Sequence, residues 1–231
     1  MTITTTTLMR GTAVAAIGAG VLFIGVQIGH PHLDAESVTT TEVVLRNWAK
    51  VLMAVLGLVG ITGLYLRQVR QSGVLGLIGY VVLGVGYLLI TSTVLAAANI
   101  LPTIAGAETA YVNDVITAIK GGTPDGDIGT LRTLLRVQDL TYLAGGVIFG
   151  FALFRARVLA RWATALLAVG GLITVVVSVL PDPFYRLVAV PNGIALIVLG
   201  ISLWRSVSAP SEMTDTAPGV AGGQLTAAAR A

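Results

Sequence analysis

The stretch RVQDLTYLAGGVIFGFALFR (residues 136–155) decides the fold class, because it is an apolar run closed by an arginine at each end. In an α-helix the 19 residue steps between Arg136 and Arg155 span about 29 Å, at roughly 1.5 Å per residue. The hydrocarbon core of a bilayer is about 30 Å thick. Each guanidinium can therefore extend to its own membrane interface, and the stretch predicts a membrane-spanning helix.

The whole chain shares this apolar character. Of its 231 residues, 55% are hydrophobic and 11% are charged, and the mean hydropathy is +0.88. Soluble domains carry about 25% charged residues, so this chain lacks the polar groups needed to cover its surface in water. The absence of cysteine excludes disulfides, thiol catalysis and thiolate metal sites. The net charge of +3 is spread over loops and helix ends, which gives no nucleic-acid-binding patch.

Six apolar segments are long enough to cross a bilayer, which takes about 20 residues. We expect an all-α, polytopic membrane protein with six transmembrane helices in a domain of residues 1–205. Because its Ser-, Ala-, Thr-, Gly- and Pro-rich sequence has no apolar periodicity, we expect the tail 206–231 to be disordered. The six segments are 11–28, 42–66, 73–95, 136–154, 162–180 and 187–204.

Two connections need separate comment. The loop 96–131 contains a stretch with Tyr111, Val112, Val115, Ile116 and Ile119 on one helical face, which predicts a short amphipathic helix at the outer surface. The first apolar segment follows a lone arginine, which is also typical of a secretory signal. It is long for that role and has no clear A-x-A site after it, so we expect an uncleaved helix.

Basic residues in the loops predict the orientation of the chain. The short loops "RQVRQSG" and "RARVLAR" carry five arginines on one side, and cytoplasmic loops are enriched in Lys and Arg. We therefore expect a multi-pass protein of the cell membrane with both termini in the cytoplasm. Eight basic residues then lie inside and six outside. The inner ones are Arg10, Arg67, Arg70, Arg155, Arg157, Arg161, Arg205 and Arg230; the outer ones are Arg46, Lys50, Lys120, Arg132, Arg136 and Arg186.

The segments also repeat in pairs. Each odd segment follows an inner arginine and ends before a proline, and each even segment lies between an outer and an inner arginine. One interpretation is three parallel copies of one helical hairpin. The other is that any six-helix membrane protein places arginine and proline at its helix ends.

Charged residues form a stripe on each of two segments near their outer ends. Glu42, Arg46 and Lys50 have i, i+4, i+8 spacing; Arg132, Arg136 and Asp139 have i, i+4, i+7 spacing. A charge at mid-bilayer costs roughly 2.5–3.5 kcal/mol on insertion scales, so we expect both stripes to face each other or a wet cavity. With Asn192 at a similar depth, they predict an outward-facing polar pocket. The candidate ligand-binding residues are Arg46, Lys50, Arg132, Arg136, Asp139 and Asn192.

The six charged positions of the two stripes carry an excess of positive charge, which favours an anionic lipid headgroup or small solute. A structural alternative is that Asp139 pairs with Lys50 or Arg46 to lock two helices together. His30 and His32, with Asp34 nearby, are too few to make a convincing metal site, and Asp125 and Asp127 lack the remaining ligands of a calcium loop. No HExxH, GxSxG or Walker motif is present.

The stretch GFALFRARVLARWATALLAVGG (residues 150–171), followed by Leu203-Trp204-Arg205, resembles a hairpin found in bacterial six-helix integral membrane proteins without an assigned function. The resemblance covers roughly residues 136–205 and implies the fold, but it transfers no catalytic residue. We therefore expect a non-enzymatic membrane protein without a cofactor or metal, whose partners are membrane lipid and an anionic small molecule. The alternatives are a small-solute transporter acting as an oligomer and an enzyme acting on lipid; the oligomeric state stays open.

Overall fold

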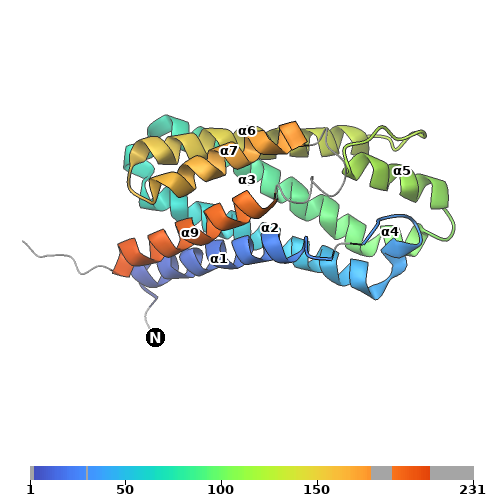
Figure 1. The fold of residues 1–231 in the computed structure, drawn as a ribbon, viewed down its shortest axis with the longest axis horizontal. Coiled ribbons are helices and arrows are strands. Elements are labelled where there is room, and N and C mark those ends of the chain that lie inside the picture. The colour runs from blue at the N-terminus through green and yellow to red at the C-terminus, as the bar shows by residue number, and fades with distance from the viewer. Residues whose placement is uncertain (1–2, 30, 178–188, 209–231) are drawn as a thin grey trace, which may run out of the picture.

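A computed structural model describes residues 3–29, 31–177 and 189–208. Most of the expected tail, the end of the fifth predicted segment, the beginning of the sixth, and residues His30, Arg186 and Arg230 lie outside these ranges. The described part is all-helical, as the sequence predicts. Long helices lie side by side in a bundle, and short helices gather at one end (Figure 1).

Within the described residues, six helices of 17 or more residues form the bundle. Five of them are long and apolar enough to cross a membrane, with α3 continuing into the short helix α4 in that assignment. The sixth, α7, is described over 17 residues, and its predicted extent 162–180 runs past the described range. The bundle helices are α1 (Thr5–Gly25), α2 (Thr41–Arg67), α3 (Val69–Asn99), α6 (Leu131–Ala156), α7 (Arg161–Val177) and α9 (Ala189–Ser208).

The bundle helices pack as a closed ring. Each contacts the one before and the one after it along the chain, and α1 also contacts α9, so the last helix returns to the first. The most extensive interfaces are α3 with α6 and α1 with α9. The first two helices have side-chain N-caps. Thr4 and Thr40 accept hydrogen bonds from backbone N–H groups in the first turns of α1 and α2, which satisfies donors that a helix leaves unpaired.

Small residues bring the helices of this ring close together. A Cβ added at Gly145 of α6 would lie 2.3 Å from the backbone nitrogen of Leu83 in α3, and one at Gly79 of α3 would lie 2.5 Å from that of Phe149 in α6. Helices in lipid gain no hydrophobic drive toward each other, so such close backbone contact is a main source of attraction. Comparable contacts occur at the other interfaces, at Gly20, Gly57, Gly60, Gly63, Gly150, Gly170, Gly193 and Gly200.

Two apolar cores lie along the bundle axis. The larger fills the bundle and includes Tyr87, Phe149, Leu83, Leu153 and Leu199, each at most 2% exposed. The smaller lies at the end where η1 (Ser37–Thr39), α4 (Leu101–Ile104) and α5 (Thr109–Ile119) gather. These short helices with their connections, residues 31–40 and 100–130, are called the cap below.

Helix α5 belongs to the cap and lies within the stretch expected to be an amphipathic helix. Its residues Val112, Val115 and Ile116 are buried and pack in the smaller core with Val38 and Leu101. The apolar face thus packs against the ends of the bundle helices. Because the sequence pattern gives the face of α5 but not its partner, the cap is visible only in the structure.

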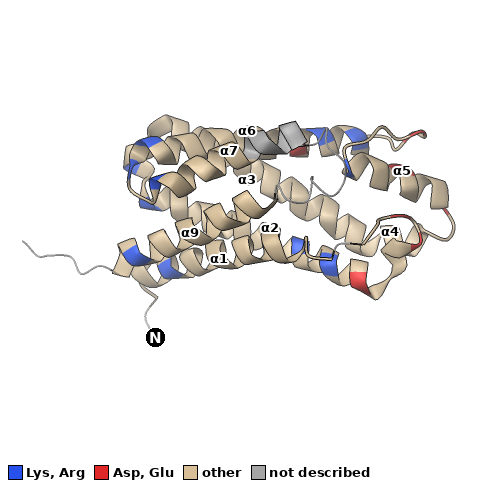
Figure 2. Ribbon diagram, in the orientation of Figure 1, with Lys and Arg blue, Asp and Glu red and all other residues tan. Residues whose placement is uncertain are grey.

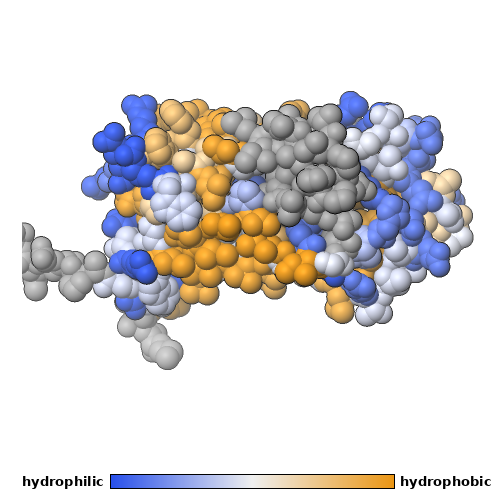
Figure 3. Space-filling model, in the orientation of Figure 1, coloured by the Kyte–Doolittle hydropathy of each residue, from blue (hydrophilic) through white to orange (hydrophobic). Residues whose placement is uncertain are grey.

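The visible face of the described chain divides into three zones (Figure 3). On the face shown in Figure 3, apolar side chains gather over the middle of the bundle and hydrophilic ones at its two ends. The long helices also carry large exposed apolar side chains such as Leu52, Val81 and Leu88, which are 52%, 50% and 55% exposed. Exposed apolar surface of this extent is typical of contact with lipid, and it supports the expected membrane protein.

Substituting Gly145 tests the close contact of α3 with α6. We expect Gly145→Ala to lower the free energy of unfolding by about 1–3 kcal/mol, because the new methyl group overpacks against backbone that cannot rotate away. The neighbouring Gly146→Ala is the matched control, since a Cβ there meets nothing within 4 Å. Thermal unfolding of both purified variants in detergent checks this, and equal melting temperatures would contradict it.

Candidate functional site

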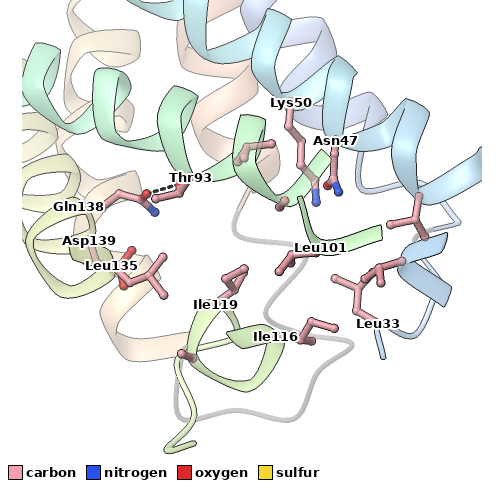
Figure 4. A pocket seen from close by; sticks show the side chains of 15 residues that line it. Leu33, Asn47, Lys50, Thr93, Leu101, Ile116, Ile119, Leu135, Gln138 and Asp139 are labelled. Carbon is pink, nitrogen blue, oxygen red and sulfur yellow. Dashed lines mark hydrogen bonds between the residues drawn. The ribbon is translucent and has the colours of Figure 1, made fainter. Parts of the chain in front are cut away.

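A cavity of about 90 Å³ lies where α2, α3 and α6 meet the cap. About 10–15 Å³ of such volume accommodates one water molecule, so the cavity has room for a small polar group and some water. Fifteen residues line it (Figure 4). They divide into a polar set from the three bundle helices and an apolar set supplied mainly by the cap.

The polar set faces across the cavity from two helices. Asn47 and Lys50 extend from α2, while Gln138 and Asp139 belong to α6 on the opposite side (Figure 4). Between them, the hydroxyl of Thr93 in α3 donates a 2.6 Å hydrogen bond to Oε1 of Gln138. This bond ties α3 to α6 and holds the Gln138 side chain at the cavity wall.

The spacing of residues along α2 explains why Lys50 faces the cavity. Val43, Asn47 and Lys50 all line it and follow an i, i+4, i+7 pattern, which keeps them on one side of a helix with about 3.6 residues per turn. Arg46 lies on a neighbouring face of α2, in a shallow depression with Leu22, Val26 and Leu45. The stripe of Glu42, Arg46 and Lys50 therefore turns around α2 instead of pointing in one direction.

The apolar set extends the cavity away from its charged groups. Leu33, Val38, Leu101, Ile116 and Ile119 belong to this set. A second cavity of about 150 Å³ shares Thr93, Ala97, Leu101, Ile119 and Leu135 with the first, and its other lining residues are Ala96, Ile100, Ile104, Tyr111, Val115 and Leu131. The two neighbouring cavities thus offer a polar wall and an apolar lining, which suit a molecule with both a polar and an apolar part.

Of the six candidate ligand-binding residues, Lys50 and Asp139 line the first cavity together. Within the described part of the chain, their side chains form no ion pair with each other, and the ion pair found there joins Arg46 to Glu42 at 2.9 Å. Lys50 is not an isolated charge, because its side chain already has a partner in the folded chain. The structure thus brings these two residues to one site without the direct helix lock considered from the sequence.

Arg46 has a structural position at the end of α1. Its Nη1 donates to the carbonyl oxygens of Val26 and Ile28 at 3.2 and 2.9 Å, and its Nη2 donates to that of Gly29 at 3.0 Å. The carboxylate of Glu42 accepts from Nε and Nη2 of the same guanidinium at 3.1 and 2.9 Å. Arg46 therefore satisfies carbonyl groups that the end of a helix leaves unpaired and fastens α1 to α2.

The other three candidates lie away from the cavity lining. Arg132 is half-buried and Arg136 is exposed, both in the first two turns of α6. Asn192 is 5% exposed and packs against Gly170, where a Cβ would meet its side-chain oxygen. It lies at the α7–α9 interface and takes no part in lining either cavity described above.

The six candidate residues chosen from the sequence omit Asn47, Thr93 and Gln138, although Gln138 stands between the candidates Arg136 and Asp139 in the stretch RVQD (residues 136–139). The i−3 spacing of Asn47 from Lys50 was the available signal for the first, and the position of Gln138 beside Asp139 was the signal for the third. Thr93 gives no such signal, since a threonine in an apolar helix usually bonds to a backbone carbonyl of the preceding turn. Thr93 also makes those bonds, to Leu89 and Ile90.

Two acidic residues of the cap, Asp34 and Asp114, accept hydrogen bonds from nearby backbone groups. Oδ1 of Asp34 accepts hydrogen bonds from the backbone N–H groups of Ser37 and Glu36 at 2.7 and 3.1 Å, and the bonds from Ser37 hold the pKa of Asp34 below its usual range. The carboxylate of Asp114 accepts from the N–H groups of Asp125 and Gly126. No group of three or more metal-ligating side chains occurs among the residues that the structure describes, a range that omits His30.

Comparison of the chain with protein-family models, with curated proteins and with solved structures finds no match.

Replacing Arg46 tests whether it fastens α1 to α2. We expect Arg46→Ala to lower the free energy of unfolding by about 1.5–3 kcal/mol, the usual value for hydrogen bonds to a charged group. Arg136→Ala, an exposed arginine at the same end of the bundle, is the control and should leave stability within about 0.5 kcal/mol. The measurement is thermal unfolding in detergent. Two variants with the same melting temperature would show that the Arg46 contacts contribute little.

Proposed function

We propose that this chain is a six-span integral protein of the cell membrane with both termini in the cytoplasm. We further propose that the first cavity, lined by Lys50 and Asp139 and called the outer cavity below, binds a small ligand. The orientation is supported by the arginines that gather at the end of the bundle opposite the cap (Figure 2), as the distribution of basic residues in cytoplasmic loops leads one to expect. The cap then faces outward, and the cavity lies just beneath it.

A threefold hairpin arrangement is part of this proposal. The pairs would be α1 with α2, α3 with α6, and α7 with α9, and the two helices of each pair contact each other. The α3–α6 pair has the most extensive interface, in agreement with a hairpin unit. Contacts between neighbouring pairs, especially α1 with α9, would then hold the three units in a ring.

The ligand class follows from the groups that line the cavity. The single observation that carries the proposal is that Lys50 and Asp139, from two different helices, line the same cavity beside three neutral polar side chains. An ammonium has three donors, so Lys50 can bind an anionic group in addition to its existing partner. Asp139 accepts hydrogen bonds, and the apolar lining accommodates hydrocarbon.

We therefore propose a ligand that combines an anionic group with an N–H donor and a short apolar part. A lipid headgroup or a small solute of this kind would carry groups complementary to Lys50 and Asp139. The sequence alone favoured a simple anion, because it assigned four basic side chains to the pocket. The described residues that line the cavity include one basic and one acidic side chain, and we propose a zwitterion to match this pair. We propose a binding function without catalysis.

Binding of short-chain phospholipids tests the proposal. We expect dihexanoyl phosphatidylethanolamine to raise the melting temperature of the purified chain in detergent, by an amount equivalent to about 2.7 kcal/mol at 100 times its dissociation constant. Dihexanoyl phosphatidylcholine, which lacks an N–H donor, should have a smaller effect. Asn47→Leu and Thr93→Val should weaken the response, and Arg136→Gln should keep it.

The outcomes separate clearly. An equal response to both lipids would contradict the requirement for an N–H donor in the ligand. An unchanged response in the two cavity variants would show that the lipid binds elsewhere on the protein. Lys50→Met is the stronger test of the charged group, but Lys50 has a partner of its own. The two neutral variants therefore keep the test valid if Lys50→Met fails to fold.

A transporter is the second candidate, and one observation favours it. At the opposite end of the bundle, Gln68 is fully buried and Ser72 nearly so, and neither side chain has a hydrogen-bond partner among the described residues. Buried polar groups are normally paired, so a second polar site lies at this end. The larger apolar core, including Leu83 and Phe149, lies between the two sites, and transport would require it to open.

Solute flux separates binding from transport. If the chain only binds, proteoliposomes should take up radiolabelled phosphoethanolamine no faster than protein-free vesicles do. Uptake that exceeds this background and is abolished by Gln68→Leu would establish the transporter instead. Circular dichroism of the reconstituted variant confirms that the loss is not due to unfolding.

A further inference from the structure

The end of the bundle opposite the cap carries a ring of arginines, called the arginine rim below. Figure 2 shows these basic residues gathered where the bundle helices end, without an acidic residue among them in the described part of the chain. The described Asp and Glu residues all lie in the cap or in the adjoining ends of α2 and α6. The rim consists of Arg10, Arg67, Arg70, Arg155, Arg157, Arg161 and Arg205.

The rim arginines fall into three groups, called sectors below, at successive positions around the ring of helices. Arg10 and Arg205 belong to the contacting helices α1 and α9, while Arg67 and Arg70 flank the junction of α2 and α3. The remaining three lie at the α6–α7 link. Each of these three sectors therefore presents at least two guanidinium groups, and cationic charge is distributed around the bundle instead of forming one patch.

Several rim side chains are held in place while staying accessible. Arg67 Nε donates to the hydroxyl of Ser206 at 3.1 Å. The guanidinium of Arg10 lies 5.4 Å from the ring centre of Trp204, and that of Arg161 lies 4.7 Å from that of Phe154. Six of the seven arginines are exposed, and the seventh, Arg10, is half-buried. Stacked guanidinium groups keep their outer N–H donors available for an anion.

Large apolar side chains border the rim. Trp162 and Trp204 are 58% and 40% exposed, and Leu66, Val69 and Val74 are 54%, 40% and 74% exposed. All of them except Val74 stand directly next to a rim arginine in the sequence. Aromatic rings of this kind prefer the headgroup level of a membrane. The rim thus combines cationic groups with an apolar surface directly beside them.

We propose that the arginine rim binds the phosphates of anionic phospholipids, with the acyl chains lying on the adjoining apolar surface. Guanidinium groups bind phosphate oxygens in a bidentate manner, and two such groups in a sector match one headgroup. A soluble anion would meet only the charges, whereas a phospholipid also meets the exposed apolar side chains. The rim and the outer cavity lie at opposite ends of the bundle, so the two binding functions are independent.

The experiment measures lipid selectivity of the full chain reconstituted in vesicles. Spin-labelled phosphatidylglycerol and phosphatidylcholine report their relative association constants with the protein. We expect the wild-type chain to select phosphatidylglycerol. The variant Arg70→Gln/Arg155→Gln/Arg205→Gln removes one exposed arginine from each sector and should lower this selectivity about fivefold, the usual effect of one basic residue near an anionic surface.

The control variant is Arg132→Gln/Arg136→Gln, which changes arginines at the cap end, and it should leave the selectivity unchanged. Loss of selectivity in the control instead of the rim variant would overturn the proposal, as would equal association of both lipids with the wild-type chain. Retained selectivity in a rim variant with normal circular dichroism would also overturn it. Complete competition by millimolar inorganic phosphate would assign the rim to soluble anions. Cavity binding of the short-chain lipid, measured separately, does not affect any of these outcomes.

Discussion

Close approach of helix backbones at glycine is the constraint on which the rest of this structure depends. The ring has glycine contacts at all of its interfaces, from Gly60 beside Ala16 to Gly150 beside Ala168. Since lipid is as apolar as leucine, hydrophobic burial cannot hold such helices together, and van der Waals contact at short range takes its place. The positions of the cavity, the cap and the arginine rim all follow from a ring that is closed in this way.

The sequence indicated the helical class and the long helices because those depend on local composition. The helical length between Arg136 and Arg155 matches the thickness of the hydrocarbon core, and α6 (Leu131–Ala156) contains that stretch. The sequence did not indicate which glycines make the close contacts between helices. Gly146 and Gly150 form a GxxxG pair in the sequence, yet the close contact with α3 is made by Gly145, while a Cβ at Gly146 would meet nothing within 4 Å. Which side of a glycine-rich helix meets its neighbour depends on helix rotation, which sequence spacing does not reveal.

In the candidate site, too, some residues could be chosen from the sequence and others could not. Lys50 and Asp139 could be chosen from the sequence, because charges deep in an apolar helix must avoid lipid. Arg46 satisfies that requirement differently, by donating to backbone carbonyls at the end of α1, and no pattern in its own helix shows those acceptors. Thr93 and the cap residues join the cavity only through tertiary packing. Part of the polar wall was therefore predictable, whereas the apolar wall and the size of the cavity were not.

The contact of α1 with α9 has a consequence for how the protein is made. These helices are the first and last of the bundle to leave the ribosome, and Gly20 and Gly193 meet where they cross. During synthesis, the small-residue face of α1 therefore stays open to lipid or to the insertion machinery until the final helix is complete. A chain truncated before α9 would therefore leave the glycine face of α1 without the helix that covers it in the complete ring.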